Sequence, residues 1–129
     1  MADQKINGAL YRSMVIEGAL AIAEKKEQAN ELNVFPVPDG DTGTNMSLTA
    51  TAMATELLKK GDTTLTKAAD TMSFATLRGA RGNSGVILSQ LFRGFTKEIR
   101  QTESITTTVL ANAFVRATET AYKAVMKPK

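Results

Sequence analysis

Apolar residues recur at intervals of three and four along most of this chain, and few stretches alternate apolar and polar residues at every second position. The first spacing places apolar side chains along one face of an α-helix, whereas alternation is typical of a strand. Glycines, prolines and capping residues divide the helical pattern into segments. We therefore expect five helices, over residues 5–28, about 43–60, from Thr63 or Thr64 as N-cap to Gly79, after Gly85 to Ile99, and about 105–126.

Each expected helix carries an apolar stripe, and the strongest lies in the fourth segment, where leucines and phenylalanines are spaced by three and four. The connections between the segments are short, which favours antiparallel neighbours. The fold is therefore expected to be all-α, an antiparallel helical array. We expect the methionine and aromatic stripes to form its core; their members include Met14, Met46, Met53, Met72, Phe92, Phe95 and Phe114.

Composition narrows the chemistry that the chain can perform. Its 129 residues include neither cysteine nor histidine. This excludes disulfides, thiolate or imidazole metal sites, Ser-His triads and histidine acid–base catalysis. Carboxylates, amides, hydroxyls, lysine, arginine and the backbone remain. A length of 129 residues, of which 43% are hydrophobic, suits one globular domain over residues 1–129.

Charge and hydropathy bear on the expected partners and location. Sixteen Lys and Arg residues against 13 Asp and Glu give a net charge of +3, and the basic residues are scattered along the chain. A nucleic-acid surface would gather them into one stripe with aromatics, so no nucleic-acid partner is expected. The apolar stretches are shorter than the roughly 20 residues of a membrane span, and the N-terminus lacks a signal pattern. We expect a soluble cytoplasmic protein.

Two carboxylates, those of Asp39 and Asp41, stand on a proline- and glycine-rich turn within residues 33–46. Two such charges at ~4 Å repel by about 4 kcal/mol near a protein surface, so a cation is expected between them if both enter one pocket. Magnesium prefers hard oxygen ligands, usually one or two carboxylates completed by water and phosphates. We therefore predict Asp39 and Asp41 as magnesium ligands, with Asn33 adding an amide oxygen; no residue is predicted as a general base.

Two other interpretations apply to the same turn. It could be an ordinary turn in which Asp41 or Thr42 caps the second helix. It could also be a calcium-binding EF-hand loop, which needs glycine at its sixth position and glutamate at its twelfth. Counted from Asp39, these positions hold Thr44 and Ala50. The EF-hand is therefore disfavoured, whereas the ordinary turn remains open.

Two segments are suited to binding phosphate. Residues 42–45 are expected to form the first turn of the second helix, where N–H groups lack partners and the helix dipole is positive. The segment 79–85 has glycine at every third position before the most apolar helix, so its N–H groups could cradle a polyphosphate, or its glycines could simply allow close helix packing. We predict that a nucleotide bridges both segments, and the candidate residues for binding it are Thr42, Gly43, Thr44, Asn45, Gly82, Asn83, Ser84 and Gly85.

At these residues the chain resembles the nucleotide-binding domain family of the dihydroxyacetone kinase L subunit. Within it, the chain is most similar to the N-terminal kinase domain of the ATP-dependent component of bacterial fatty acid kinase. The resemblance rests on residues 33–46, 79–90 and 121–128 and spans essentially the whole chain. It implies an eight-helix antiparallel barrel, of which about five helices are present here, incomplete at the C-terminus. ATP and two magnesium ions would bind at one end, where Asn83 and Ser84 would contact the nucleotide.

The resemblance also implies a reaction, in which ATP phosphorylates the carboxylate of a fatty acid held by a separate acyl-binding protein and gives an acyl phosphate. The dihydroxyacetone branch has a third aspartate and a histidine where this chain has Asn33 and Thr42, which favours the fatty acid branch. Two alternatives stay open: a dihydroxyacetone or polyol kinase subunit that uses a phosphotransfer partner, and a non-catalytic helical adaptor. Apolar faces left uncovered in an incomplete barrel would also favour a homo-oligomer.

Overall fold

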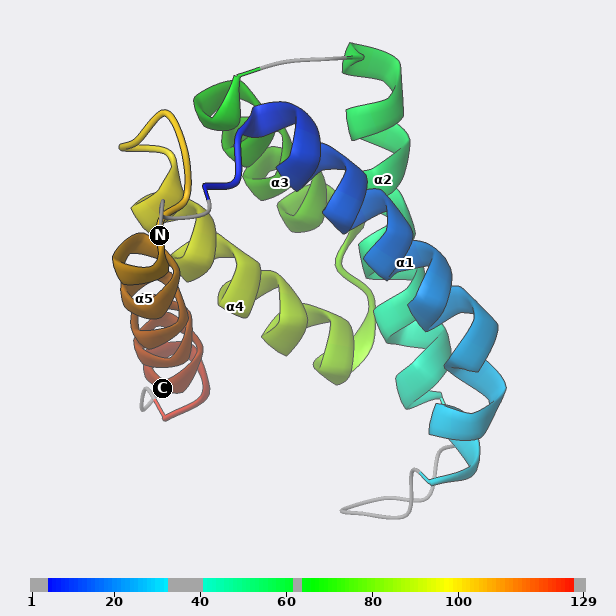
Figure 1. Ribbon diagram of the computed structural model, residues 1–129. Coiled ribbons are helices and arrows are strands. Elements are labelled where there is room, and N and C mark those ends of the chain that lie inside the picture. The colour runs from blue at the N-terminus through cyan, green and yellow to red at the C-terminus, as the bar shows by residue number, and fades with distance from the viewer. Residues whose placement is uncertain (1–4, 33–40, 62–63, 127–129) are drawn as a thin grey trace.

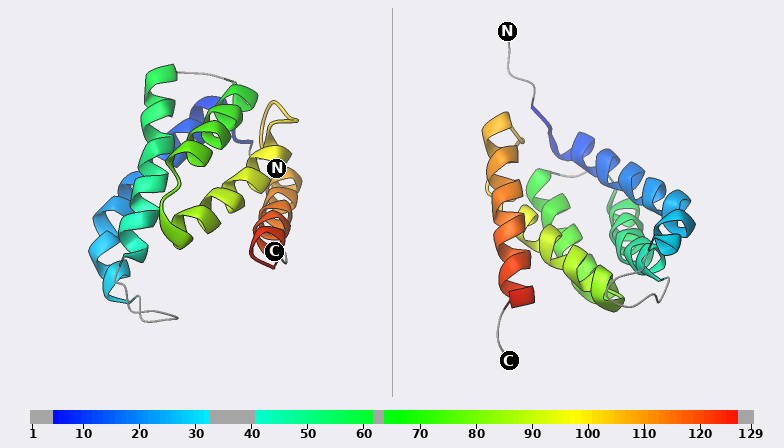
Figure 2. Two further views of the ribbon diagram at one scale, coloured as in Figure 1. Left: turned by 180° about the vertical axis from the view of Figure 1, so that it is seen from behind. Right: turned by 90° about the horizontal axis from the view of Figure 1, so that it is seen from below.

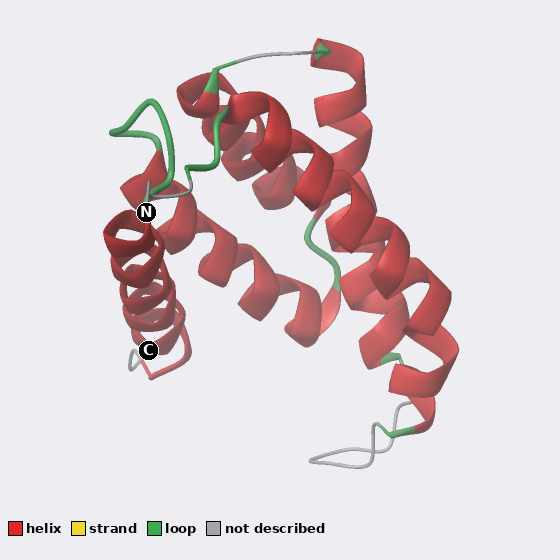
Figure 3. Ribbon diagram, viewed as in Figure 1, coloured by secondary structure: helices red, strands yellow, loops and turns green. Residues whose placement is uncertain are grey.

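Five helices make up the fold of the computed structural model, which describes residues 5–32, 41–61 and 64–126 (Figure 1). No strand occurs in these ranges, as the colouring of Figure 3 makes plain. The expected all-α class and the number of helices are confirmed. The helices are α1 (Gly8–Glu31), α2 (Thr42–Lys60), α3 (Leu65–Gly79), α4 (Gly82–Ile99) and α5 (Thr107–Met126).

Side-chain caps fix several of the helix starts. The oxygen of Asn7 accepts a hydrogen bond from the N–H of Leu10 at 2.9 Å. Thr64 caps α3 in the same way through the N–H of Lys67 at 3.2 Å, as expected from the sequence. These contacts satisfy N–H groups that have no partner within the helix, so each helix begins just after its cap.

Several boundaries differ from the sequence-based expectation. The first helix, expected over residues 5–28, begins at Gly8 and ends at Glu31. The fourth helix begins at Gly82 rather than after Gly85, so the second half of the glycine-rich segment 79–85 is helical. Glycine is a weak helix former, and tertiary packing at Gly85 outweighs that preference here.

The helices follow one another up and down in an antiparallel array (Figures 1 and 2). The first packs on α2, α2 and α3 pack on each other and on α4, and α5 packs on α4. Two backbone hydrogen bonds between Ile6 and Ile105, with N–O distances of 2.9 and 2.7 Å, join the segment before α1 to the segment before α5. Seen from below in Figure 2, α1 and α5 stand on opposite sides of the array.

The core lies where α2 and α3 meet. The apolar face expected for the third helix is confirmed, because all five of its members are buried: Leu65, Ala68, Ala69, Met72 and Ala75. Met53 and Leu57 of α2 and Ile99 of α4 complete it. None of the helices in the described ranges is both long and apolar enough to cross a lipid bilayer.

The expectation that the methionine and aromatic stripes form the core is wrong for Met14 and Phe114, whose side chains are 50% and 59% exposed. The apolar stripe expected for the fifth helix, which comprised Leu110, Phe114, Ala117, Ala121 and Val125, is confirmed for Ala117 and Ala121, which are buried together with Ala113. Close approach explains this choice, because a Cβ on Gly94 of α4 would meet the Arg116 carbonyl oxygen at 2.5 Å. Small residues are what such a short interhelical distance allows.

Candidate functional site

The start of α2 is one half of the predicted site. Asp41 is the N-cap residue; its side chain is exposed and makes no capping hydrogen bond to the helix. Its carbonyl oxygen accepts the first intrahelical bond, from the N–H of Asn45 at 2.9 Å. Asp41 is thus the N-cap residue, as the ordinary-turn interpretation expected, although its side chain does not make the capping hydrogen bond. Asp39 and Asn33, the other predicted metal ligands, lie outside the described residues.

A residue from another helix makes the capping contact in its place. The side chain of Asn30, near the end of α1, accepts a hydrogen bond from the N–H of Thr44 at 3.0 Å. The same amide donates to the Thr44 hydroxyl oxygen at 2.9 Å. Both groups are half-buried, which protects the pair from water. The first turn of α2 is thus bonded to α1.

Gly43 brings the two helices close enough for this contact. It is buried, and a Cβ placed on it would collide with the carbonyl group of Lys26 in α1. Any side chain at this position would push the start of α2 away from α1. The glycine is therefore required by packing, in addition to any part that its N–H plays in binding a phosphate.

The start of α4 is the other half of the predicted site, and it lies against α2. Gly82 has φ +68°, a conformation that side chains rarely adopt, and the amide group of Asn45 fills the space where its Cβ would stand. One turn further on, a Cβ on Gly85 would collide with the hydroxyl of Thr49 and lie 3.3 Å from the Asn45 carbonyl oxygen. The two predicted segments are thus in direct contact.

Thr49 links the two helix starts through its hydroxyl group. Its side chain is fully buried, and its hydroxyl donates to the Asn45 carbonyl oxygen at 2.9 Å. The hydroxyl oxygen of Thr49 in turn accepts a hydrogen bond from the N–H of Arg81, the N-cap residue of α4, at 3.3 Å. Asn83 and Ser84 follow in the first turn of α4, where N–H groups have no intrahelical acceptor. Two positive helix ends therefore adjoin each other.

Sequence reasoning missed Asn30 and Thr49. Neither belongs to a glycine-rich segment, and each acts on residues 14 or 32 positions away in the chain. A weak signal was present for Asn30, because an asparagine just before a turn often bonds to nearby backbone. Nothing in the local pattern marks Thr49, which reads as an ordinary helical threonine.

Among the described residues, few acidic groups lie at the adjoining starts of α2 and α4 to bind a metal ion. The described parts of the chain contain no cluster of three or more His, Cys, Asp or Glu side chains able to hold a metal. Asp41 is the carboxylate that these parts place at the adjoining helix starts, and Arg81 is an exposed cation next to them. Such a site suits an ion that takes most of its ligands from phosphates and water, as magnesium does.

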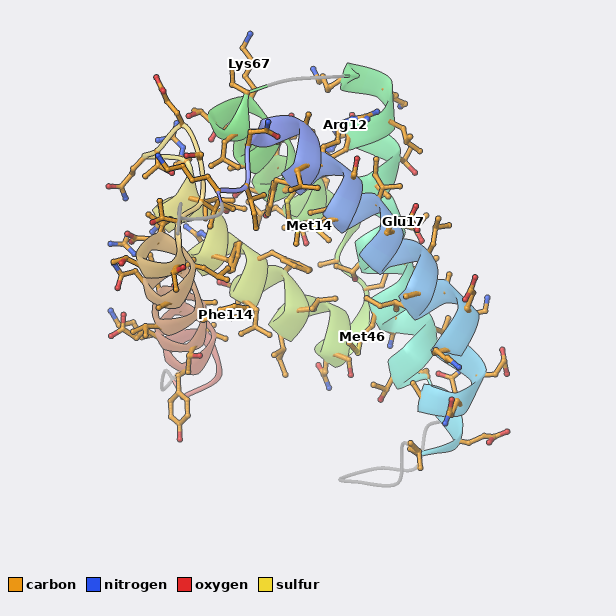
Figure 4. All side chains as sticks on the ribbon, in the orientation of Figure 1. Arg12, Met14, Glu17, Met46, Lys67 and Phe114 are labelled. Atoms are coloured by element: carbon orange, nitrogen blue, oxygen red, sulfur yellow. The ribbon has the colours of Figure 1, made fainter. Side chains whose placement is uncertain are left out.

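A second feature was not expected from the sequence, an open apolar cavity of about 460 Å³ between α1, α2, α4 and α5. Figure 4 labels Met14 and Phe114, which line it from helices on opposite sides. Phe92 and Phe95, from the strong apolar face expected for α4, pack against the core. They also line this cavity, together with Leu88 and Leu91 of the same face. None of the predicted nucleotide-binding residues described in the structure is among its lining residues.

Comparison with known proteins gives one family and several close relatives. A family model described as the DAK2 domain matches residues 36–129. Uncharacterized proteins of Staphylococcus aureus strains USA300, COL and MRSA252 are each 51% identical over 124 residues. These alignments cover 96% of this chain but 23% of each relative. The chain thus spans less than a quarter of the length of the curated relatives that it matches.

Proposed function

The chain belongs to the DAK2 domain family, and on that premise we propose that it is the nucleotide-binding part of an ATP- and magnesium-dependent fatty acid kinase. Family membership supports a kinase-related function. The finer assignment, transfer of the γ-phosphoryl group of ATP to the carboxylate of a fatty acid, is our proposal. Within the family, we propose kinship to the N-terminal kinase domain of the ATP-dependent component of bacterial fatty acid kinase.

One observation carries the proposal, the direct contact between the two glycine-rich helix starts. Asn45 of α2 lies on Gly82 of α4, and Thr49 bonds to the backbone of both segments. A triphosphate has several anionic groups a few ångströms apart, so two adjoining positive helix ends suit it better than one. Thr42, Gly43, Asn83 and Ser84 would face it with backbone N–H groups and short polar side chains.

The metal assignment depends on the chemistry of the donors. Asp41, with the carboxylate of Asp39 and the amide of Asn33, would hold two magnesium ions between the protein and the phosphates. These oxygen donors, with no cysteine or histidine in the chain, fit magnesium rather than zinc or copper. Bound magnesium would neutralise charge on the transferred phosphoryl group.

The chain's own part in the reaction is to position the reacting groups and to stabilise charge on the phosphoryl group. A carboxylate oxygen of the fatty acid attacks the γ-phosphorus, the bond from the γ-phosphorus to the bridging oxygen breaks, and ADP leaves with that oxygen. A fatty acid is already ionised at neutral pH, so no general base has to remove a proton. The helix-start N–H groups would stabilise the charge on the phosphoryl oxygens. The absence of histidine and cysteine is thus compatible with the proposed chemistry.

The proposed substrate is brought by a partner. We propose that a separate acyl-binding protein presents the fatty acid carboxylate, in the cytoplasm where ATP is available. Asn33 and Thr42, in place of an aspartate and a histidine, favour this branch over dihydroxyacetone kinases. The relatives are more than four times as long as their aligned part, so the complete kinase would include sequence beyond this domain.

A phosphoryl-transfer assay tests the proposal. The chain and a full-length S. aureus relative are each incubated with Mg-ATP and a purified acyl-binding protein loaded with fatty acid; ADP and acyl phosphate, trapped as the hydroxamate, are measured. From the full-length protein we expect both products. From the chain we expect at least binding of the nucleotide. Turnover with dihydroxyacetone but not with fatty acid would favour a polyol kinase. Absence of turnover and of nucleotide binding in both proteins would leave a helical adaptor.

A further inference from the structure

We propose that Asn30 is a positioning residue of the nucleotide site, which caps α2 from a neighbouring helix and sets the orientation of Thr44. This inference rests on the proposed function, because it assigns the residue a part in binding the phosphates of ATP. Asn30 lies outside both glycine-rich segments, near the end of α1. It contacts the predicted site through two hydrogen bonds to one residue.

The first step of the argument is the position of Thr44 within α2. It is the third residue of the helix, and the N–H of that residue is the one that an N-cap side chain normally accepts from. Here the accepting oxygen belongs to Asn30, at 3.0 Å. The cap is therefore supplied by α1, and the stability of the first turn of α2 is coupled to the placement of α1.

The second step concerns the Thr44 hydroxyl. An asparagine side chain offers a donor and an acceptor at the same time, and Asn30 uses both on Thr44. Because the hydroxyl oxygen accepts from the Asn30 amide, its own hydrogen is directed away from Asn30. A hydroxyl held in this way is set to donate to an anionic ligand. A carboxylate at position 30 could accept from the N–H but could not donate to the hydroxyl.

The third step is rigidity. One turn before Asn30, the carbonyl of Lys26 packs against Gly43 so closely that no Cβ would fit. Successive turns of α1 thus fix neighbouring residues of α2, Gly43 by packing and Thr44 by hydrogen bonds. Preorganised donors bind a phosphate without a further entropy cost of ordering, so this contact favours nucleotide affinity.

The experiment combines amide exchange without ligand and nucleotide affinity. Asn30→Ala, Asn30→Asp and the control Gln28→Ala, at an exposed position on α1, are compared with the wild type. Hydrogen–deuterium exchange of residues 41–49 is measured by mass spectrometry, and Mg-ATP affinity by competition with a fluorescent ATP analogue. For Asn30→Ala we expect faster exchange in the first turn of α2 and about tenfold weaker Mg-ATP binding, the effect of losing one or two hydrogen bonds.

The aspartate variant separates positioning from stability. Asn30→Asp keeps an acceptor for the Thr44 N–H, so exchange should stay close to that of the wild type while the Mg-ATP affinity falls at least about tenfold, because it loses the donor and adds a negative charge near the phosphates. If either variant bound Mg-ATP as tightly as the wild type, the inference would be wrong whatever the exchange showed. If the wild type itself bound no Mg-ATP while its α2 amides stayed protected, the proposed function would fail, and this inference with it.

Discussion

The amide group of Asn45 occupies the space beside Gly82 in which every other residue would place its Cβ. This contact joins the first turn of α2 to the first residue of α4. It requires two things at once, a positive φ at position 82 and the absence of a side chain there. The adjoining helix starts, on which the proposed ATP site depends, therefore tolerate no substitution at Gly82.

Replacing Gly82 by alanine should damage both folding and nucleotide binding. A positive φ costs a non-glycine residue about 1–3 kcal/mol, and displacing Asn45 adds about 1 kcal/mol or more. Mg-ATP affinity should fall at least about tenfold, because the two helix starts separate. Urea unfolding and competition with a fluorescent ATP analogue measure the two effects.

Gly61 supplies a matched control for that experiment. It has the same φ of +68°, but a Cβ there would meet nothing within 4 Å. Gly61→Ala should therefore show the backbone cost of about 1–3 kcal/mol without loss of Mg-ATP affinity. Equal losses in the two variants would show that the contact with Asn45 is unimportant.

Gly43 and Gly18 form a second matched pair, both of them within helices. A Cβ on Gly43 would collide with the Lys26 carbonyl, whereas one on Gly18 would meet nothing within 4 Å. Gly43→Ala should lower the free energy of unfolding by about 1–3 kcal/mol, because α1 and α2 must move apart. Gly18→Ala should raise it by roughly 0.5–1 kcal/mol through helix propensity. Chemical denaturation decides the matter, and a neutral Gly43→Ala would contradict the packing described here.

The open apolar cavity predicts self-association of this chain. Met14 and Phe114 are half-exposed or more at its edge, and burying such side chains is worth roughly 1.5–3 kcal/mol each. Sedimentation velocity should show an oligomer whose fraction rises with protein concentration. Met14→Gln with Phe114→Gln should weaken association at least about tenfold.

The control pair for association lies on exposed apolar residues away from the cavity, Leu58→Gln with Leu77→Gln. These two substitutions should leave the association constant close to that of the wild type. A wild type that stays monomeric at every concentration, or a control that dissociates as readily as the cavity variant, would contradict the prediction.

The free energy of unfolding should fall in alkaline solution, in part because the phenol of Tyr11 is buried in the folded protein. Burial raises the pKa of Tyr11 above its ordinary value of 10, because the charged phenolate is poorly solvated in the core. The folded protein then holds a proton that the unfolded chain releases above pH ~10. This contribution is fully present below that pH and is lost above it, with a slope of at most roughly 1.4 kcal/mol per pH unit.

Urea unfolding between pH 8 and 11 measures that effect. We expect Tyr11→Phe to show a shallower loss of unfolding free energy above pH ~10 than the wild type. Tyr122→Phe, at an exposed position of α5, should retain the wild-type slope. Identical slopes in all three proteins would rule out a contribution from Tyr11.

Some elements were predictable because local pattern and tertiary packing agree. In α3 the threonine cap and the spacing of Leu65, Ala68, Ala69, Met72 and Ala75 both point to the observed helix and its buried face. In α5 they disagree. Periodicity placed Phe114 in the core together with Ala117 and Ala121, but the close contact with α4 at Gly94 buries only the two alanines, with Ala113, and leaves Phe114 exposed. Hydropathy cannot tell which members of an apolar stripe fit so close a partner.

The candidate site divides in the same way. Glycines and short polar residues mark residues 42–45 and 82–85, because unusual backbone requirements leave a trace in the sequence. Asn30 leaves only a weak trace and Thr49 none, since their partners Thr44 and Arg81 lie far along the chain. The predicted magnesium ligands Asp39 and Asn33 lie outside the described residues and stay a prediction, as do ATP, the two magnesium ions and the acyl-binding partner.

Calorimetric titration of Mg-ATP tests the central claim most directly. The wild type is compared with Asp39→Asn/Asp41→Asn and with Glu17→Gln/Glu119→Gln, which removes two exposed charges elsewhere. We predict saturable binding that requires magnesium, a loss of at least about 100-fold in the Asp39 and Asp41 variant, and wild-type affinity in the control. Binding that persists unchanged without these two carboxylates, or a folded wild type that binds no nucleotide, would contradict the account.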